Sequence, residues 1–325
     1  MPMVETVRGP VEADALGQTL MHEHVFVLSP EHVENYGRRT WWDEERRVAD
    51  AIAKLRALNA KGVTTIVDPT VWGLGRYIPR IQRVAAEVPG LNIIVATGLY
   101  SFDEVPHQYA HRGPGLLLDM PEPMIEDFTR DITEGIADTG VKAAFLKCVV
   151  ESRGLTEGVE RICRAVARTH VRTGVPIIVH TDAFTRSGLL ALDLFAKEGV
   201  DLTKVAVGHA GDSNDLDYLM RLADTGATLG MDRFGLDVYN STADRVATVA
   251  ALYDRGYADR MVLSHDTACF MDYFAGAWDD AVPLVVPNWR FGHIHDDVLP
   301  ALKEKGVPDA AIEQMLVTNP RRYFS

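Results

Sequence analysis

The chain has few cysteines, no long apolar run and no excess of basic residues. Its 325 residues include only three cysteines, Cys148, Cys163 and Cys269, which cannot all pair and lack zinc-ribbon spacing. This usage is typical of a reducing compartment. No segment approaches the roughly 18 consecutive apolar residues of a membrane helix, and the first twenty residues lack the apolar centre of a signal peptide. We therefore expect a soluble, cytoplasmic protein with no membrane partner.

Positive charge is scarce as well. Against 46 acidic residues there are 33 basic ones, for a formal net charge of -13, which repels polyanions over most of the surface. Nucleic acid is therefore not an expected partner. The hydrophobic content of 47% is typical of a globular enzyme, and no linker rich in Pro, Gly or Ser divides the chain. We expect one domain over residues 1–325, with the first eighteen residues as a short N-terminal cap.

Short apolar segments rich in Val, Ile and Leu alternate with amphipathic stretches. Near-continuous apolar runs are typical of parallel strands covered on both faces, and apolar residues at helical spacing predict a helix over residues 46–60, followed by Gly62 as its cap. Eight such units favour an α/β protein with a (β/α)8 TIM barrel over a doubly wound sheet. The eight predicted strands cover residues 19–27, 64–70, 92–100, 143–150, 176–181, 205–211, 228–235 and 261–267.

Five of these segments carry polar side chains that a core strand does not need. In a strand, His22 and His24 share one face and point into the barrel, whereas Glu23 points toward the helices. A single histidine in an apolar strand is more often a hydrogen-bonded core residue, but packing gives no reason for several to occupy equivalent strand ends. Because barrel enzymes build their sites at those ends, the set predicts a divalent transition-metal centre. Its members are His22, His24, Lys147, His180, His209 and Asp266.

Other polar residues have a structural interpretation. Asp68 and Asp232 lie in the same segments, where they can support the ligands. The HIHDD sequence at 293–297 repeats the HxH spacing but leads into a predicted helix, where residues i and i+2 diverge, so we interpret it as structural or surface. Asp182 is expected near the metals and could bind a positively charged substrate group or weaken the binding of anionic ones. Lys147 is costly as a buried ammonium ion unless it is paired or neutralised.

The ordered motifs resemble a known family. HEH on the first predicted strand, Lys on the fourth, His on the fifth and sixth, and SHD on the eighth resemble the amidohydrolase superfamily. More narrowly, the chain resembles the phosphotriesterase-like lactonases over essentially its whole length. The motifs that carry this resemblance are LMHEHVFV, GLGRYIPRI, ATGLY, GVERICRAVA, GHAGDS, LGMDRFG, VLSHD and NPRRYF.

The resemblance implies a binuclear centre of zinc, cobalt, iron or manganese and a homodimeric enzyme. Lys147 would react with carbon dioxide, and the resulting carbamate would bridge both ions, so that a costly buried cation becomes an anionic ligand. The resemblance assigns three further ligands to the more buried ion and two to the more exposed one: His22, His24 and Asp266 for the first, and His180 and His209 for the second.

The resemblance also implies how the site works. A hydroxide that bridges the ions would attack the substrate carbonyl, Asp266 would pass the proton toward the leaving alkoxide, and Tyr100 would hydrogen-bond near the hydroxide or the carbonyl oxygen. Arg233 stands where efficient phosphotriesterases place histidine and lactonases place arginine. It is expected near the substrate, with a salt bridge to Asp232 or Asp212 as the alternative. Asp212 would support the site or relay a proton.

The aromatic segment 268–291 should lie over the mouth of the site, where an apolar lid could hold an acyl chain. Tyr273 is expected in the pocket; alternatively, these aromatic residues pack the loop or form a dimer contact. We expect a metal-dependent lactonase that acts on small molecules, N-acyl-homoserine lactones or related γ- and δ-lactones, and so quenches quorum sensing, with promiscuous phosphotriesterase activity. The alternatives are an organophosphate or carboxylester hydrolase and, in another class, a non-catalytic barrel stabilised by metal.

Overall fold

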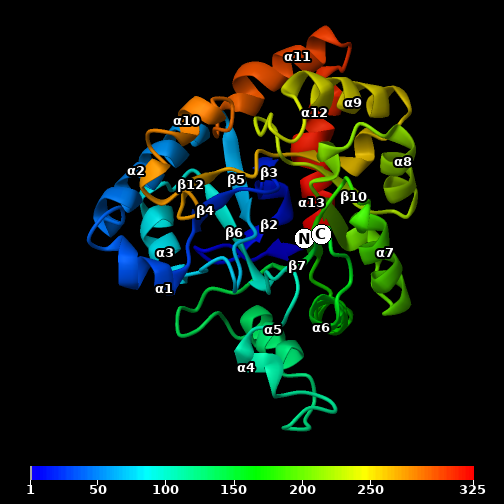
Figure 1. Cartoon of the computed structure of the whole chain (residues 1–325). Helices are drawn as coiled ribbons and strands as arrows, with labels where there is room; N and C mark the ends of the chain where they lie inside the picture. The colour runs from blue at the N-terminus through cyan, green and yellow to red at the C-terminus, as the bar shows by residue number, and fades with distance from the viewer. Residues whose placement is uncertain (1) are drawn as a thin grey trace.

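The computed structural model describes residues 2–325 and contains a barrel of eight parallel strands (Figure 1). The strands are hydrogen-bonded in the order in which they follow along the chain. This arrangement confirms the predicted (β/α)8 fold. The barrel strands are β3 (Gln18–Leu20), β5 (Val63–Asp68), β6 (Asn92–Gly98), β7 (Phe145–Val150), β8 (Ile177–Thr181), β9 (Val205–Gly208), β10 (Thr228–Met231) and β11 (Met261–Leu263).

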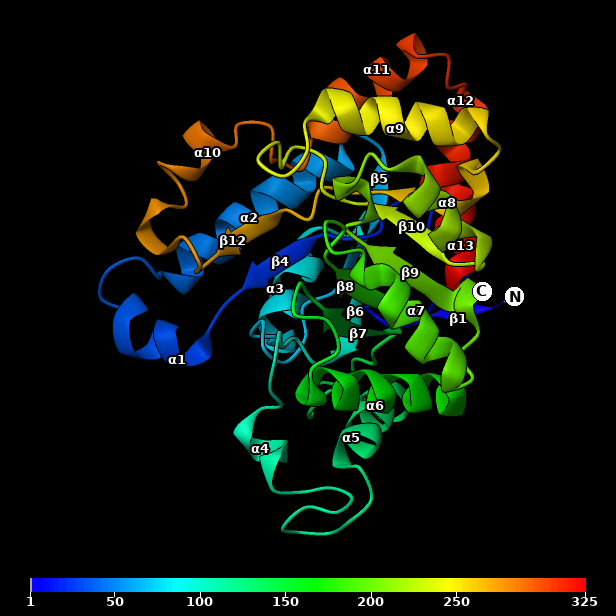
Figure 2. The same cartoon turned by 45° about the vertical axis from the view of Figure 1, so that its right-hand side comes forward.

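Helices surround the barrel on its outer side (Figures 1 and 2). Capping residues set their ends: α6 begins after Thr156, whose Oγ1 accepts a hydrogen bond from the Val159 amide, and ends at Thr173, before the capping residue Gly174 with φ +77°. The helix predicted over 46–60 is α2, and Gly62, with φ +98°, makes the following turn instead of capping it. The main helices are α2 (Glu44–Asn59), α3 (Ile78–Glu87), α5 (Pro123–Thr133), α6 (Glu157–Thr173), α7 (Ser187–Lys197), α8 (Leu216–Asp224), α9 (Thr242–Asp254), α11 (Leu299–Glu304), α12 (Asp309–Glu313) and α13 (Asn319–Phe324).

The first predicted strand, residues 19–27, was wrong as one element. β3 ends at Leu20, the chain bends at residues 21–23, and β4 (His24–Val27) leaves the barrel to pair in parallel with β12 (Ala268–Met271). These two strands run side by side in Figure 2. The bend has a physical cause, because the His22 amide donates to Ser264 Oγ at 2.9 Å and the Asp266 amide donates to the His22 carbonyl at 3.0 Å. These bonds join the barrel between β3 and β11.

The N-terminal residues pack against the start of the barrel strands. A short hairpin of β1 (Met3–Val4) and β2 (Val11–Glu12) precedes β3. Val4 and Leu16 are buried in one apolar cluster with Phe145, the first residue of β7, and with Tyr323 of the last helix. Residues 2–18 therefore close one end of the barrel, as expected of the N-terminal cap, and leave the opposite end for the site.

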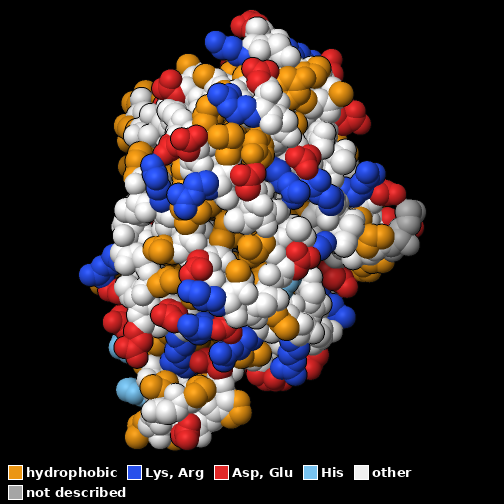
Figure 3. Space-filling view, turned by 90° about the vertical axis from the view of Figure 1, so that its right-hand side faces the viewer, with side chains coloured by type: hydrophobic (Ala, Val, Ile, Leu, Met, Phe, Trp, Pro, Cys, Tyr) orange, Lys and Arg blue, Asp and Glu red, His pale blue; other side chains and the backbone are white. Residues whose placement is uncertain are grey.

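The outer helical face carries charges of both signs. Figure 3 shows acidic and basic side chains interspersed on this side of the molecule. On α7, Lys197 pairs with Asp193 at 2.6 Å, one helical turn away. Within residues 2–325, none of the helices combines the length and the apolar character needed to cross a bilayer.

Candidate active site

A cavity of about 550 Å³ opens at the carboxyl ends of the barrel strands. Its floor contains five of the six predicted ligands, and its walls are largely apolar. The sixth, His209, is buried directly behind His180, with the two rings 4.4 Å apart. Strand ends far apart in the sequence therefore meet at one place, as expected of a barrel. The five ligands that line the floor are His22, His24, Lys147, His180 and Asp266.

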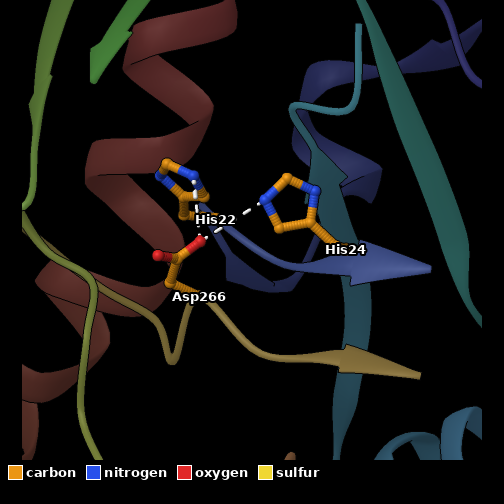
Figure 4. A group of neighbouring side chains, drawn as sticks. All are labelled: His22, His24 and Asp266. Carbon is orange, nitrogen blue, oxygen red and sulfur yellow. Dashed lines mark ion pairs between the residues drawn. The ribbon is translucent and has the colours of Figure 1, made fainter. Parts of the chain in front are cut away.

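One group of ligand atoms surrounds Asp266 (Figure 4). His22 Nε2 and His24 Nε2 each lie 3.4 Å from Asp266 Oδ1, and the three side chains could hold an ion between them. Lys147 Nζ lies 3.4 Å from His22 Nε2. Four predicted ligands thus converge on one point, and each is largely withdrawn from solvent.

A second group lies beside the first. His180 Nδ1 and His209 Nε2 are 2.9 Å apart, and the rings of His209 and His22 are 4.9 Å apart. The edge of Tyr100 packs on His180 at 5.4 Å between ring centroids. The two groups are close enough to form a single centre with two positions.

The outward-facing nitrogens of the histidines are held by other side chains. Asp232 Oδ2 lies 3.0 Å from His22 Nδ1, and its Oδ1 lies 3.0 Å from His209 Nδ1. His24 Nδ1 lies 2.7 Å from Thr70 Oγ1. Partners of this kind fix the ring orientation and the tautomer of metal-binding histidines, and here they leave the Nε2 atoms facing the centre. Asp232 therefore has the supporting role that its position suggested.

Two of the predicted ligands lie on strained backbone. His209 has φ +65° and Asp266 has φ +52°, a region that residues other than glycine rarely adopt and that costs of order 1–3 kcal/mol. The His209 amide donates to Asp232 Oδ1 at 2.8 Å, and the Asp266 amide is bonded to His22. These bonds hold both residues in conformations that aim their side chains at the centre.

Lys147 is a buried amine that lacks a charged partner among the described residues in the absence of a bound metal or a modification. It is 1% exposed, and burial lowers its pKa from 10.5 to about 8. Its nearest polar partner is a histidine ring nitrogen, and within residues 2–325 it forms no salt bridge. A buried amine among four imidazoles and a carboxylate matches a donor set for divalent transition ions.

Asp266 is also the end of a chain of alternating charges. Arg233 donates from Nε to Asp266 Oδ2 and from Nη1 to Asp212 Oδ2, both at 2.9 Å. Arg245, on α9, donates to Asp212 Oδ1 at 2.6 Å. Burial raises the pKa of Asp266, but the imidazole of His22 and the Arg233 guanidinium outweigh this and hold that pKa well below its usual value. Arg233 thus makes the predicted salt bridge to Asp212, and it also lines the cavity.

The sequence is similar to those of known proteins along its whole length. A model of the phosphotriesterase family matches residues 2–324. The chain belongs to the phosphotriesterase family.

Relatives in this family match along nearly their whole length. The chain is 55% identical to a phosphotriesterase homology protein of Mycobacterium tuberculosis, covering 100% of this chain and 98% of the relative. It is 35% identical to an aryldialkylphosphatase of Saccharolobus solfataricus, covering 97% of each chain. The solved structure of the phosphotriesterase from Mycobacterium tuberculosis superposes with a TM-score of 0.97, at 55% identity over 100% of this chain and 98% of that one. As a member of the phosphotriesterase family, the protein is a metal-dependent hydrolase.

Three acidic residues have partners that the sequence did not predict. Glu23, expected to face the helices, is buried against the loop after β11, where its Oε1 accepts hydrogen bonds from Ser264 Oγ at 2.8 Å and from the His265 amide at 2.9 Å. Asp182 lines the cavity, but its Oδ1 accepts the Phe184 amide at 2.7 Å and so caps a turn. Glu151 was missed: its Oε1 lies 3.3 Å from His180 Nε2. Its place directly after a buried strand was the available signal.

The aromatic lid, residues 268–291, has both roles that the sequence allowed: some of its side chains line the cavity, and others pack the loop. Tyr273 and Phe274 line the cavity. Trp278 instead packs the loop together, 6.0 Å from Phe274 and 5.8 Å from Trp289 between ring centroids. Trp289 Nε1 donates a hydrogen bond to the Asp266 carbonyl at 3.1 Å. This bond connects the lid to the loop after β11, which carries Asp266.

The second HxH sequence is structural, as predicted. His293 is buried, with Nδ1 2.7 Å from Asp297 Oδ2 and Nε2 3.0 Å from Thr242 Oγ1. Both ring nitrogens are therefore engaged by neighbouring side chains, and His293 does not line the cavity.

Proposed function

We propose that this protein is a lactonase that opens N-acyl-homoserine lactones or related γ- and δ-lactones. The observation that carries the proposal is one cavity with two chemically different parts. Its floor holds five of the six predicted metal ligands, and its wall is an apolar lid of a size that suits an acyl chain. The apolar wall includes Leu236, Tyr273, Phe274, Val282, Val285 and Val286.

The proposed cofactor is a pair of divalent ions, with zinc preferred and cobalt, iron or manganese as alternatives. His22, His24 and Asp266 would hold the deeper ion, and His180 and His209 the other. Lys147, as a carbamate formed with carbon dioxide, would contribute to both. Its lowered pKa supports this step, because the neutral amine is the form that reacts with carbon dioxide. When bound, the ions act as Lewis acids toward water and toward the substrate carbonyl.

The protein's own residues supply proton transfer and orientation. Asp266 is proposed to accept the proton from the attacking water and deliver it to the leaving alkoxide. Arg233 holds Asp266 by Oδ2, so Oδ1 is the oxygen that faces His22 and His24, and Asp212 fixes Arg233 from behind. Tyr100 is proposed to donate to the carbonyl oxygen, because burial raises its pKa and keeps its hydroxyl protonated. Tyr273 would contact the substrate at the mouth.

We also propose that residues 1–325 form one hydrolase domain, and that the enzyme is a cytoplasmic homodimer. The family match over residues 2–324 supports the first statement. The dimer rests on the family resemblance, and sedimentation analysis of the purified protein tests it. The cytoplasmic location rests on the cysteine usage and the composition of the sequence.

A hydrolysis panel tests the function. It compares lactones of graded acyl length, an aryl phosphotriester and a carboxylester, with the metal-loaded protein and with protein treated with a chelator. We expect kcat/KM to be highest for lactones and to depend on metal. Phosphotriester turnover above that of every lactone would favour the second candidate, an organophosphate hydrolase, to which the name of the Saccharolobus relative points. A folded, metal-loaded protein inert toward all substrates would favour the non-catalytic barrel.

A further inference from the structure

Each of the four histidines at the centre has one ring nitrogen facing the other ligands and one facing a fixed partner. For three of them that partner lies within the protein interior: Asp232 serves His22 and His209, and Thr70 serves His24. His180 alone has its partner on the cavity side. That partner is Glu151, a residue without a role in the function proposed above.

Glu151 is placed by the strand that carries Lys147. It follows β7 directly, lines the cavity, and keeps a side chain that is 27% exposed, whereas the side chain of His180 is 5% exposed. Glu151 Oε1 lies 3.3 Å from His180 Nε2, and His180 Nδ1 lies 2.9 Å from His209 Nε2. Aromatic rings cover other sides of the imidazole, with Tyr100 at 5.4 Å and Phe102 at 5.9 Å.

This geometry selects one tautomer of His180. When Nε2 carries the proton and donates it to the carboxylate, the lone pair of Nδ1 is free on the side of His209. A carboxylate in this position also makes the imidazole more basic and therefore a stronger ligand. Because Asp232 supports a histidine in each group and Glu151 supports only His180, loss of Glu151 should affect one ion.

We propose that Glu151 is a positioning residue that tightens the binding of the more exposed ion by holding His180. This inference rests on the proposed metal centre, because His180 and His209 must be the ligands of that ion. It assigns Glu151 no contact with substrate and no part in proton transfer.

Asp182 offers a matched control. It is a second carboxylate of the same cavity, two residues after His180, but its Oδ1 is bonded to the backbone amides of Phe184 and Thr185. Asp182→Asn therefore removes one negative charge from the cavity without releasing a histidine. Glu151→Ala removes both the charge and the acceptor, and Glu151→Gln keeps an acceptor oxygen without the charge.

The experiment measures metal retention. Wild type and the three variants are equilibrated with zinc at graded free concentrations, and metal per chain is determined by elemental analysis, with circular dichroism to verify folding. We expect Glu151→Ala to lose one ion at a free zinc concentration about 10–100-fold higher than wild type does. It should retain the other ion as wild type does. Glu151→Gln should fall between the two proteins, and Asp182→Asn should match wild type.

Three results would overturn the inference. In the first, Glu151→Ala retains both ions as wild type does. In the second, Asp182→Asn loses an ion as readily, so that charge alone explains the effect. In the third, wild type binds no second ion, which overturns the proposed centre as well. Wild type with two ions but no lactone turnover would refute only the lactonase proposal, and a selective loss of one ion in Glu151→Ala would still support the role of Glu151.

Discussion

Replacing Lys147 by methionine should stabilise the metal-free protein. The same replacement should abolish the activity of the protein supplied with metal. Methionine has a similar length and volume and carries no charge. Burial lowers the pKa of Lys147 from 10.5 to about 8. Each pKa unit corresponds to about 1.4 kcal/mol of free energy between the protonated and neutral forms. The folded, metal-free protein therefore carries a penalty of about 3 kcal/mol for this ammonium group at neutral pH.

The pH dependence follows from the direction of the shift. A lysine whose pKa is lowered on folding destabilises the native state fully below the folded value, about 8. The penalty shrinks as pH rises toward the unfolded value and is about 1 kcal/mol at pH 10. The advantage of Lys147→Met should therefore be largest at pH 6.5 and small at pH 10.

The assay is thermal unfolding of both metal-free proteins, followed by circular dichroism in buffers free of carbon dioxide. With an unfolding entropy of about 2.1 cal/mol/K per residue, a 325-residue chain gains about 4 °C in Tm from 3 kcal/mol. Equal Tm values at pH 6.5, or a gain that is unchanged at pH 10, would refute the idea that an unpaired buried charge sits at this position.

Three further predictions follow from the contacts described above. Dialysis against a chelator should reduce lactone hydrolysis to the background rate, and zinc with bicarbonate should restore it; full activity in metal-free protein would contradict the proposed chemistry. Arg245→Leu should lower the free energy of unfolding by about 3–5 kcal/mol in a urea titration, because it leaves the buried Asp212 carboxylate without one of its two cations; a loss below about 1 kcal/mol would show that the pair contributes little. Val285→Asp should raise KM about tenfold for long-chain lactones and leave short-chain ones unchanged, because it puts a charge where the acyl chain would be buried. Leu284→Asp, a neighbouring lid residue that does not line the cavity, is the control, and equal effects of both variants would place the chain elsewhere.

Local sequence carries most of the information about the barrel. Apolar runs and helical spacing are properties of short segments, so the strands and helices could be predicted without knowledge of their neighbours. The bend between β3 and β4 could not, because it depends on residues more than 240 positions away: the His22 amide donates to Ser264, and the Asp266 amide donates to the His22 carbonyl. The apolar residues on both sides of HEH are compatible with one continuous strand and with two strands separated by a bend, so they do not distinguish the two.

The convergence of the proposed ligand residues could be predicted for a related reason. A histidine or lysine in an apolar strand is conspicuous by itself, and the barrel brings the strand ends together. Acidic residues in loops are common, so Glu151 and Asp182 look equivalent in the sequence. Only the structure shows that one reaches His180 and the other caps a turn. The charge chain from Asp266 through Arg233 to Arg245 likewise depends on three separate strand and helix ends meeting.

The pairing of β4 with β12 separates the segment that positions the predicted metal centre from the segment that covers the cavity. The ribbon they form carries His24 at its base and the lid at its far end, with each strand anchored by the other. Insertions, deletions and substitutions between Tyr273 and Asn288 can therefore alter which molecules are admitted while the ribbon keeps the reactive centre intact. Substitutions in this loop are therefore expected to change which molecules bind more than they change the position of His24.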